Sequence, residues 1–215
     1  MNKCGLGQIR GNLRILKPPT FIRFPMNVEL VEGKPARIVC TIIGVPKPEV
    51  SWWKDGQPIQ PGDGLYFENK DGGDVYELVI EDTVPEDAGI YQVKAFNEGG
   101  IAEAEATLGI LVPATFAVPL KTEAEFIVGK KIKLTCQIFG IPKPRLVWYH
   151  DNFDISNNFR YKRKFDEDGN YQMTIASANI MDRGVYRAEA INSVGRDVCE
   201  CKVKVWETNG NLLQS

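Results

Sequence analysis

Few residues in this sequence have the types and spacing that chemistry requires. His150 is the only histidine among 215 residues, so no pairing of a nucleophile with a histidine base recurs or converges, and a catalytic triad is not supported. Its place beside Asp151, at the end of an expected strand, predicts an exposed turn residue. Gly5-Leu6-Gly7 neither follows a strand nor opens a helix, as a phosphate-binding loop would. The sequence therefore indicates a protein that is not an enzyme.

Two cysteines form a Cys-x-Cys pair, Cys199 and Cys201, which could bind a metal or undergo redox chemistry. No histidine stands near them to complete a zinc site with ordinary spacing. Two residues apart on one strand, their Cβ vectors are nearly parallel, which is a poor geometry for a mutual disulfide. Two hydrophobic side chains on an inward strand face are the favoured interpretation. The sequence leaves open a bridge from Cys136 to either of them.

Acidic side chains cluster at 71–74 and 166–168 and could suggest calcium. Both clusters flank expected hairpin turns and lack the number of ligands that a specific calcium site needs. We therefore expect neither a metal nor a cofactor.

The run Arg160-Tyr161-Lys162-Arg163-Lys164 is the main candidate for a partner-binding surface. On a strand, Arg160, Lys162 and Lys164 would share one face. That face would suit an acidic filament surface such as actin, or a phosphoinositide headgroup. The alternative is a solvated edge strand whose lysines discourage edge-to-edge pairing.

Trp53 is a second candidate for partner binding. Alternation along its strand turns Trp52 inward and Trp53 outward. An outward tryptophan can anchor a protein contact, or it can pack beneath neighbouring strands of its own sheet.

The elements that must position these side chains come in two copies. The run CTIIGVPKPEVSW, from Cys40 to Trp52, returns from Cys136 to Trp148 as CQIFGIPKPRLVW, and DAGIY at 87–91 returns as DRGVY at 182–186. The period, about 95 residues, is that of a whole small domain rather than a solenoid repeat.

Each copy shows seven or eight short alternating runs with turn signals at roughly ten-residue spacing, which predicts an antiparallel β-sandwich. The fold class is thus all-β, with two sandwiches in tandem. In each sandwich a cysteine, a tryptophan and a tyrosine are expected to point into the core: Cys40, Trp52 and Tyr91 in the first, and Cys136, Trp148 and Tyr186 in the second.

The predicted boundaries are a flexible arm at 1–16, domains at 17–112 and 113–207, and a tail at 208–215, with a very short linker near Pro113. No apolar run is long enough to span a bilayer, and no secretory signal is present at the start. The net charge of −2 conceals an asymmetry. Residues 17–112 hold 8 Lys/Arg and 16 Asp/Glu, whereas residues 113–207 hold 15 and 12. The acidic first domain argues against nucleic acid as a partner.

Both copies resemble immunoglobulin-like domains of the intermediate set, over about nine tenths of the chain. The shared features are a cysteine, Pro-Lys-Pro, a tryptophan, Asp-x-Gly-x-Tyr, and an asparagine before glycine: Cys40, 46–48, Trp52, 87–91 and Asn97, then Cys136, 142–144, Trp148, 182–186 and Asn192. The resemblance implies two packed sheets in each domain. It also implies a corner tyrosine whose hydroxyl bonds back to the backbone near the turn.

One departure from that family pattern is informative. Secreted immunoglobulin domains have a second cysteine two residues after the tyrosine, where this sequence has Val93 and Ala188. Cys40 and Cys136 are therefore expected to be free thiols that act as small core hydrophobes. Omission of the bridge from both domains indicates a reducing interior, hence a cytoplasmic location.

Bridge-free tandem domains of this set resemble parts of the giant muscle proteins titin, twitchin, projectin, obscurin and kettin. The resemblance implies a monomeric structural and interaction module of a sarcomere or myofibril. It would give mechanical spacing and docking surfaces for actin, myosin or another giant filament protein. The alternative is an actin-binding or bundling adaptor of the palladin and myotilin type, which would use the basic strand of the second domain. A cell-surface adhesion receptor is disfavoured by the missing bridges.

Overall fold

The computed structural model describes residues 14–69 and 72–207. Cys4, most of the expected N-terminal arm and the expected tail at 208–215 lie outside them. The chain divides into two compact units, 1–109 and 110–215. In the described parts of the chain, no helix has the length and apolar character that a membrane span needs.

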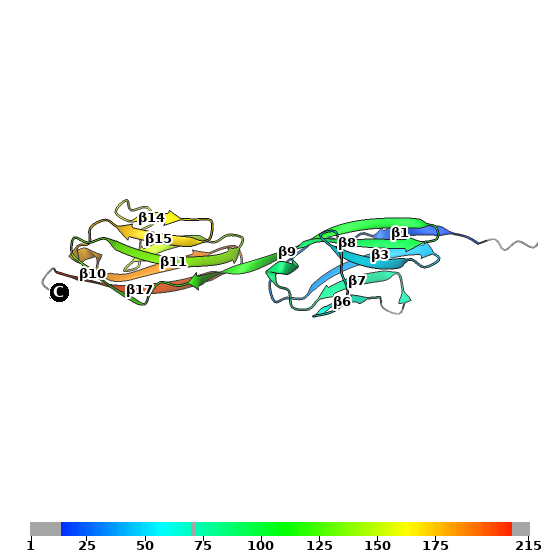
Figure 1. Cartoon of the computed structure of the whole chain (residues 1–215), viewed down its shortest axis with the longest axis horizontal. Helices are drawn as coiled ribbons and strands as arrows, with labels where there is room; N and C mark the ends of the chain where they lie inside the picture. The colour runs from blue at the N-terminus through cyan, green and yellow to red at the C-terminus, as the bar shows by residue number, and fades with distance from the viewer. Residues whose placement is uncertain (1–13, 70–71, 208–215) are drawn as a thin grey trace, which may run out of the picture. The chain divides into compact units, whose positions relative to one another are not determined.

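The first unit is a sandwich of two sheets, and Figure 1 shows its strands. One sheet has the order β1-β3-β7-β6, and in the other β2 and β8 pair with β9, and β4 and β5 follow β8. A 3-10 turn, η2 (Pro85–Asp87), precedes β8. The strands are β1 (Lys17–Arg23), β2 (Val28–Val31), β3 (Ala36–Val45), β4 (Glu49–Lys54), β5 (Gln57–Pro58), β6 (Leu65–Glu68), β7 (Val75–Ile80), β8 (Gly89–Asn97) and β9 (Gly100–Val118).

The second unit repeats this plan, with β9-β11-β15-β14 in one sheet and β10-β17-β16-β12-β13 in the other. Its 3-10 turn is η3 (Ile180–Asp182), just before β16. The strands are β10 (Glu123–Ile127), β11 (Ile132–Ile141), β12 (Arg145–His150), β13 (Phe153–Asp154), β14 (Lys162–Phe165), β15 (Asn170–Ile175), β16 (Gly184–Ile191) and β17 (Arg196–Trp206).

Strict alternation places the core of each unit between its sheets. In β11 the burial alternates along the whole strand, because successive side chains point to opposite faces. The expected core residues are all buried: Cys40, Trp52, Tyr91, Cys136, Trp148 and Tyr186. Trp148 is 1% exposed and packs in a cluster with Cys136, Met173 and Tyr186.

Both units use the same tight turn after the tryptophan strand. Asp55 and Gly56 have φ values of 50° and 79°, and Asp151 and Asn152 have 47° and 69°. Two successive left-handed residues form the hairpin turn that matches the twist of the flanking strands. Asn152 takes the glycine position because asparagine tolerates this conformation. The turn is equivalent in the two units, although the second has His150-Asp151-Asn152 where the first has Lys54-Asp55-Gly56.

The connection between the units lies within a strand. β9 runs unbroken from Gly100 to Val118, through the position near Pro113 where the sequence predicts a very short linker. Its first part pairs with β8, up to Leu108, and its last part pairs with β11, from Val112. The last strand of one unit thus continues as the first strand of the next.

Because Trp52 is buried and its neighbour Trp53 is only half-buried, the two residues should contribute differently to the free energy of unfolding. Trp52→Ala should destabilise the first unit by about 3–5 kcal/mol, because the cavity cannot close fully. Trp53→Ala removes the same atoms from a half-buried site and should cost less than half as much. Guanidinium unfolding curves of the whole chain measure both values. Equal losses for the two variants would contradict the assignment of Trp52 as the central core residue.

Candidate partner-binding surface

A tyrosine corner closes each sandwich. The Tyr91 hydroxyl donates to the carbonyl of Asp87 at 2.9 Å, and the Tyr186 hydroxyl donates to that of Asp182 at 3.0 Å. The Asp87 carboxylate in turn accepts the N–H of Val84 at 2.9 Å. The corner therefore holds a 3-10 turn against the strand that follows it, as the family resemblance implies.

The glycine of each Asp-x-Gly-x-Tyr motif leaves room for an aspartate from the tight turn. Asp151 Oδ1 accepts the N–H of Val185 at 2.8 Å, and Asp55 does the same for Ile90 at 2.9 Å. A Cβ on Gly184 would lie 2.4 Å from the Asp151 carboxylate. Each aspartate reaches the motif strand because β4 pairs with β8 in the first unit and β12 pairs with β16 in the second.

His150 is not the exposed turn residue that the sequence predicted. Its side chain is 13% exposed and stacks on Tyr186, with ring centroids 4.3 Å apart. Nε2 lies 2.9 Å from the carbonyl oxygen of Arg183, and Nδ1 lies 3.2 Å from the Tyr161 hydroxyl. The prediction was wrong because alternation carries the last residue of β12 over the corner tyrosine rather than into solvent.

The first unit has a lysine in the matching place. The Lys54 ammonium lies 5.9 Å from the centre of the Tyr91 ring and donates to the carbonyl of Glu86. His150 and Lys54 thus make the same pair of contacts, one with the ring and one with a corner carbonyl. This shared structural role accounts for the only histidine without invoking catalysis.

The cysteines lie as the sequence favoured. Cys201 is buried and Cys199 is partly buried against the same core, and all four described cysteines are unbridged. Within the described residues, no cluster of three or more potential ligands could hold a metal ion. Burial raises the pKa of the Cys40 and Cys136 thiols to about 12, so both are protonated at neutral pH.

The basic run is divided by the structure, and one prediction about it is wrong. Arg160 precedes β14 and does not share a strand face with Lys162 and Lys164. Its guanidinium Nε donates to Asp182 Oδ1 at 3.0 Å, and Nη2 pairs with the other carboxylate oxygen. Arg163 points elsewhere, donating to the carbonyl of Ile155 at 3.0 Å. Arg160 is drawn off its expected face because the buried Asp182 requires a cation.

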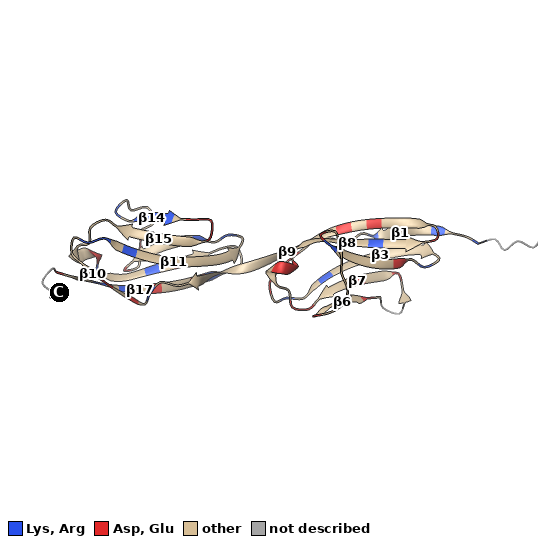
Figure 2. Ribbon diagram, viewed as in Figure 1, with Lys and Arg blue, Asp and Glu red and all other residues tan. Residues whose placement is uncertain are grey.

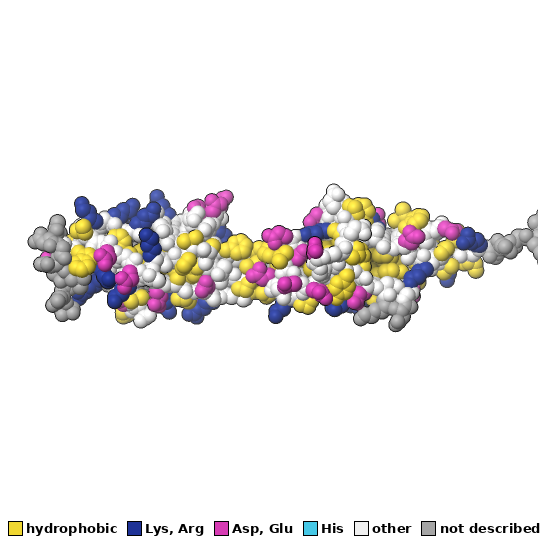
Figure 3. All heavy atoms as spheres, turned by 60° about the horizontal axis from the view of Figure 1, so that its bottom comes forward, with side chains coloured by type: hydrophobic (Ala, Val, Ile, Leu, Met, Phe, Trp, Pro, Cys, Tyr) yellow, Lys and Arg dark blue, Asp and Glu magenta, His cyan; other side chains and the backbone are white. Residues whose placement is uncertain are grey.

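Lys133 of β11, rather than Arg160, lies on the same sheet face as Lys162 and Lys164. Lys162 lies opposite Thr174 of β15, and Thr174 lies opposite Lys133 of β11. Figure 2 shows the basic positions on β14 and β11, and basic side chains gather along one edge of the second unit in Figure 3. We name Lys133, Lys162 and Lys164 the lysine surface. In the described chain, none of these three ammonium groups has an ion-pair partner.

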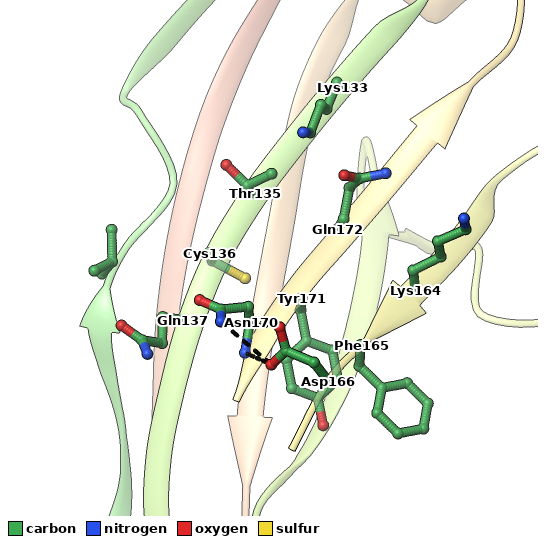
Figure 4. Close-up of a pocket in the computed structure, with 11 residues that line it drawn as sticks. Lys133, Thr135, Cys136, Gln137, Lys164, Phe165, Asp166, Asn170, Tyr171 and Gln172 are labelled. Atoms are coloured by element: carbon green, nitrogen blue, oxygen red, sulfur yellow. Dashed lines mark hydrogen bonds between the residues drawn. The ribbon is translucent and has the colours of Figure 1, made fainter. Parts of the chain in front are cut away.

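A shallow groove of about 490 Å³ runs along this surface. Figure 4 shows Lys133, Gln172 and Lys164 on three neighbouring strands. At one end Asp166 accepts hydrogen bonds from the backbone and side chain of Asn170, and these bonds lower the pKa of the Asp166 carboxyl. Sequence spacing could not find Lys133, because the register of β11 against β15 brings it to the surface.

Trp53 fits the second of its two interpretations. It is half-buried, its indole N–H donates to Ser51 Oγ at 3.2 Å, and the Lys94 ammonium lies 4.4 Å from its ring centre. Its strand neighbour across β5 is Pro58. Trp53 therefore packs beneath side chains of its own sheet.

These features define a tandem of immunoglobulin-like sandwiches in which the lysine surface is exposed and, among the described residues, has no ion-pair partner. The model of the immunoglobulin I-set domain matches residues 19–110 and 114–205. The chain belongs to the immunoglobulin I-set family.

Relatives with similar sequences include a muscle assembly protein, myotilin and hemicentin-2. The muscle M-line assembly protein unc-89 of Caenorhabditis elegans is 33% identical over 184 residues, which are 84% of this chain and 2% of that protein. Mouse myotilin is 31% identical over 193 residues, 87% of this chain and 39% of myotilin. The chain thus spans well under half the length of these relatives. Among solved structures, titin A168–A169 matches with a TM-score of 0.71 and 26% identity, covering 88% of this chain and 99% of that one.

The raised thiol pKa values predict slow alkylation. In the native protein at neutral pH, iodoacetamide should modify Cys40 and Cys136 at least about 100-fold more slowly than in guanidinium, because the thiolate is the nucleophile. Peptide mass spectrometry follows each cysteine separately. Rapid native modification of Cys40 would contradict its placement in the core.

Proposed function

We propose that this chain is a structural and interaction module of a sarcomeric or cytoskeletal filament protein, located in the cytoplasm. The observation that carries the proposal is the residue two places after each corner tyrosine. Val93 and Ala188 occupy these sites and are fully buried, so each sandwich is held by apolar packing where a secreted domain has a disulfide. A fold stable without disulfides suits a reducing compartment. The similarity to unc-89 and myotilin points to muscle.

Localisation tests this proposal directly. The whole chain, fused to a fluorescent protein and expressed in striated muscle cells, should give a banded pattern in register with the sarcomeres. The fluorescent protein alone is the control. A diffuse or surface-membrane signal would contradict the proposed location.

The geometry of the terminal strands supports a mechanical role. In the second unit β10 pairs with β17 in parallel over five residue pairs, Glu123↔Lys202 to Ile127↔Trp206. Because this strand pair lies near the two chain ends of the unit, a pull on those ends loads its hydrogen bonds in shear. A ruptured domain of about 95 residues would release roughly 300 Å of chain.

A proline pair tests that role. Lys202 N–H donates to Thr122 O, and Val128 N–H donates to Trp206 O, so by alternation Ala124 and Phe126 carry the bonds between them. In single-molecule pulling, Ala124→Pro should lower the rupture force of the second unit, because proline has no N–H to donate.

Glu125→Pro is the matched control, since the Glu125 N–H points away from β17 and its loss should leave the force nearly unchanged. An equal drop in both variants, or no domain-sized steps in the wild-type chain, would argue against the parallel pair as the mechanical element.

An actin-binding adaptor is the second candidate, and the unpaired lysine surface favours it. Co-sedimentation with filamentous actin tests it. Binding that weakens with salt and is lost in Lys162→Glu/Lys164→Glu would support the adaptor, and wild-type protein that stays in the supernatant would exclude it.

A further inference from the structure

The edge strand β14 is more exposed than its counterpart β6, which is also at a sheet edge. In the described chain β14 pairs only with β15, and all four of its residues are exposed. In the first unit the matching strand β6 pairs with β7, and all four of its residues are half-buried. In an antiparallel pair, alternate residues point their N–H and C=O groups outward. The outer edge of β14 therefore presents unused backbone donors and acceptors.

The charge on this face also differs between the units. In the first unit Arg37 pairs with Glu77 at 2.9 Å, and Glu68 lies 4.0 Å away. Register places Lys133 where Arg37 stands, Gln172 where Glu77 stands, and Lys164 where Glu68 stands. Both compensating carboxylates are thus replaced, one by a neutral amide and one by a further cation.

This combination selects the kind of strand that can join the edge. Two copies of β14 would bring their own ammonium groups together, so the lysines discourage self-pairing. A strand carrying carboxylates meets no such repulsion. Lys162 and Lys164 lie about 6.6 Å apart along the strand, which is the spacing of alternate side chains in any extended peptide. Phe165 is 71% exposed at the end of the row and offers an apolar contact.

We propose that β14 binds an extended acidic peptide segment of a partner protein by strand addition, with carboxylates at alternate positions facing the lysine surface. Backbone hydrogen bonds would supply affinity, and the alternate carboxylates would supply selectivity. The proposal rests on the docking role proposed above. If the peptide does not bind, the proposed muscle location is unaffected, because the fluorescence experiment in muscle cells tests that location independently.

Titration of the ¹⁵N-labelled whole chain with three synthetic peptides tests the proposal. Acetyl-TVEVEVT-amide should shift the amides of residues 162–165 in a saturable way and slow hydrogen exchange at two of them. The amides of 65–68 in the first unit are an internal control and should not move. Acetyl-TVEPEVT-amide has the same charge but lacks one strand N–H, and acetyl-TVKVKVT-amide has the opposite charge. Both should bind at least tenfold more weakly.

Charge reversal provides the second arm. The variant Lys162→Glu/Lys164→Glu should no longer bind acetyl-TVEVEVT-amide and should bind acetyl-TVKVKVT-amide instead. Lys130→Glu/Lys202→Glu changes the net charge equally at exposed sites elsewhere in the unit and should bind like wild type. The proposal would be overturned by no shift at about 1 mM peptide, by equal binding of the proline peptide, or by binding of phosphatidylserine vesicles or filamentous actin without peptide binding.

Discussion

Each unit depends on the burial of one indole between two sheets that no covalent bond joins. Trp52 and Trp148 are 2% and 1% exposed, and the cluster around Trp148 includes aliphatic side chains, Tyr186 and the Cys136 thiol. Since a disulfide is typically worth about 2–4 kcal/mol, packing and hydrogen bonds must provide what a bridge would. The tyrosine corner and the aspartate over the motif glycine contribute at the place where the chain crosses between sheets.

The features of the fold that depend on the periodicity of the sequence could be predicted from it. The repeat, the sandwich class and the six core residues follow from alternation and from shared motif spacing, and the family match confirms the class. The predictions that were wrong or incomplete concerned contacts that depend on the register between strands distant in sequence. Arg160 was expected on a strand face, but a buried carboxylate 22 residues away holds it. Lys133 was missed because only the alignment of β11 with β15 brings it beside Lys162.

His150 is a second residue whose environment could not be predicted from its sequence neighbours. Its sequence neighbours suggest a turn, and only the stacking partner from β16 explains its burial. Lys54 in the first unit makes equivalent contacts with a different side chain, so the position requires a ring-facing group that can donate to a carbonyl rather than a particular residue. The two units thus share a framework, while their exposed faces carry different charge, Arg37 compensated in one and Lys133 uncompensated in the other.

The unbroken strand β9 has a practical consequence for anyone dividing this chain. Residues up to 108 are hydrogen-bonded to β8 and residues from 112 to β11, and between them Ile110 is only 3% exposed. A recombinant fragment of the first unit therefore has to include β9 up to Leu108, and a fragment of the second unit has to include it from Val112.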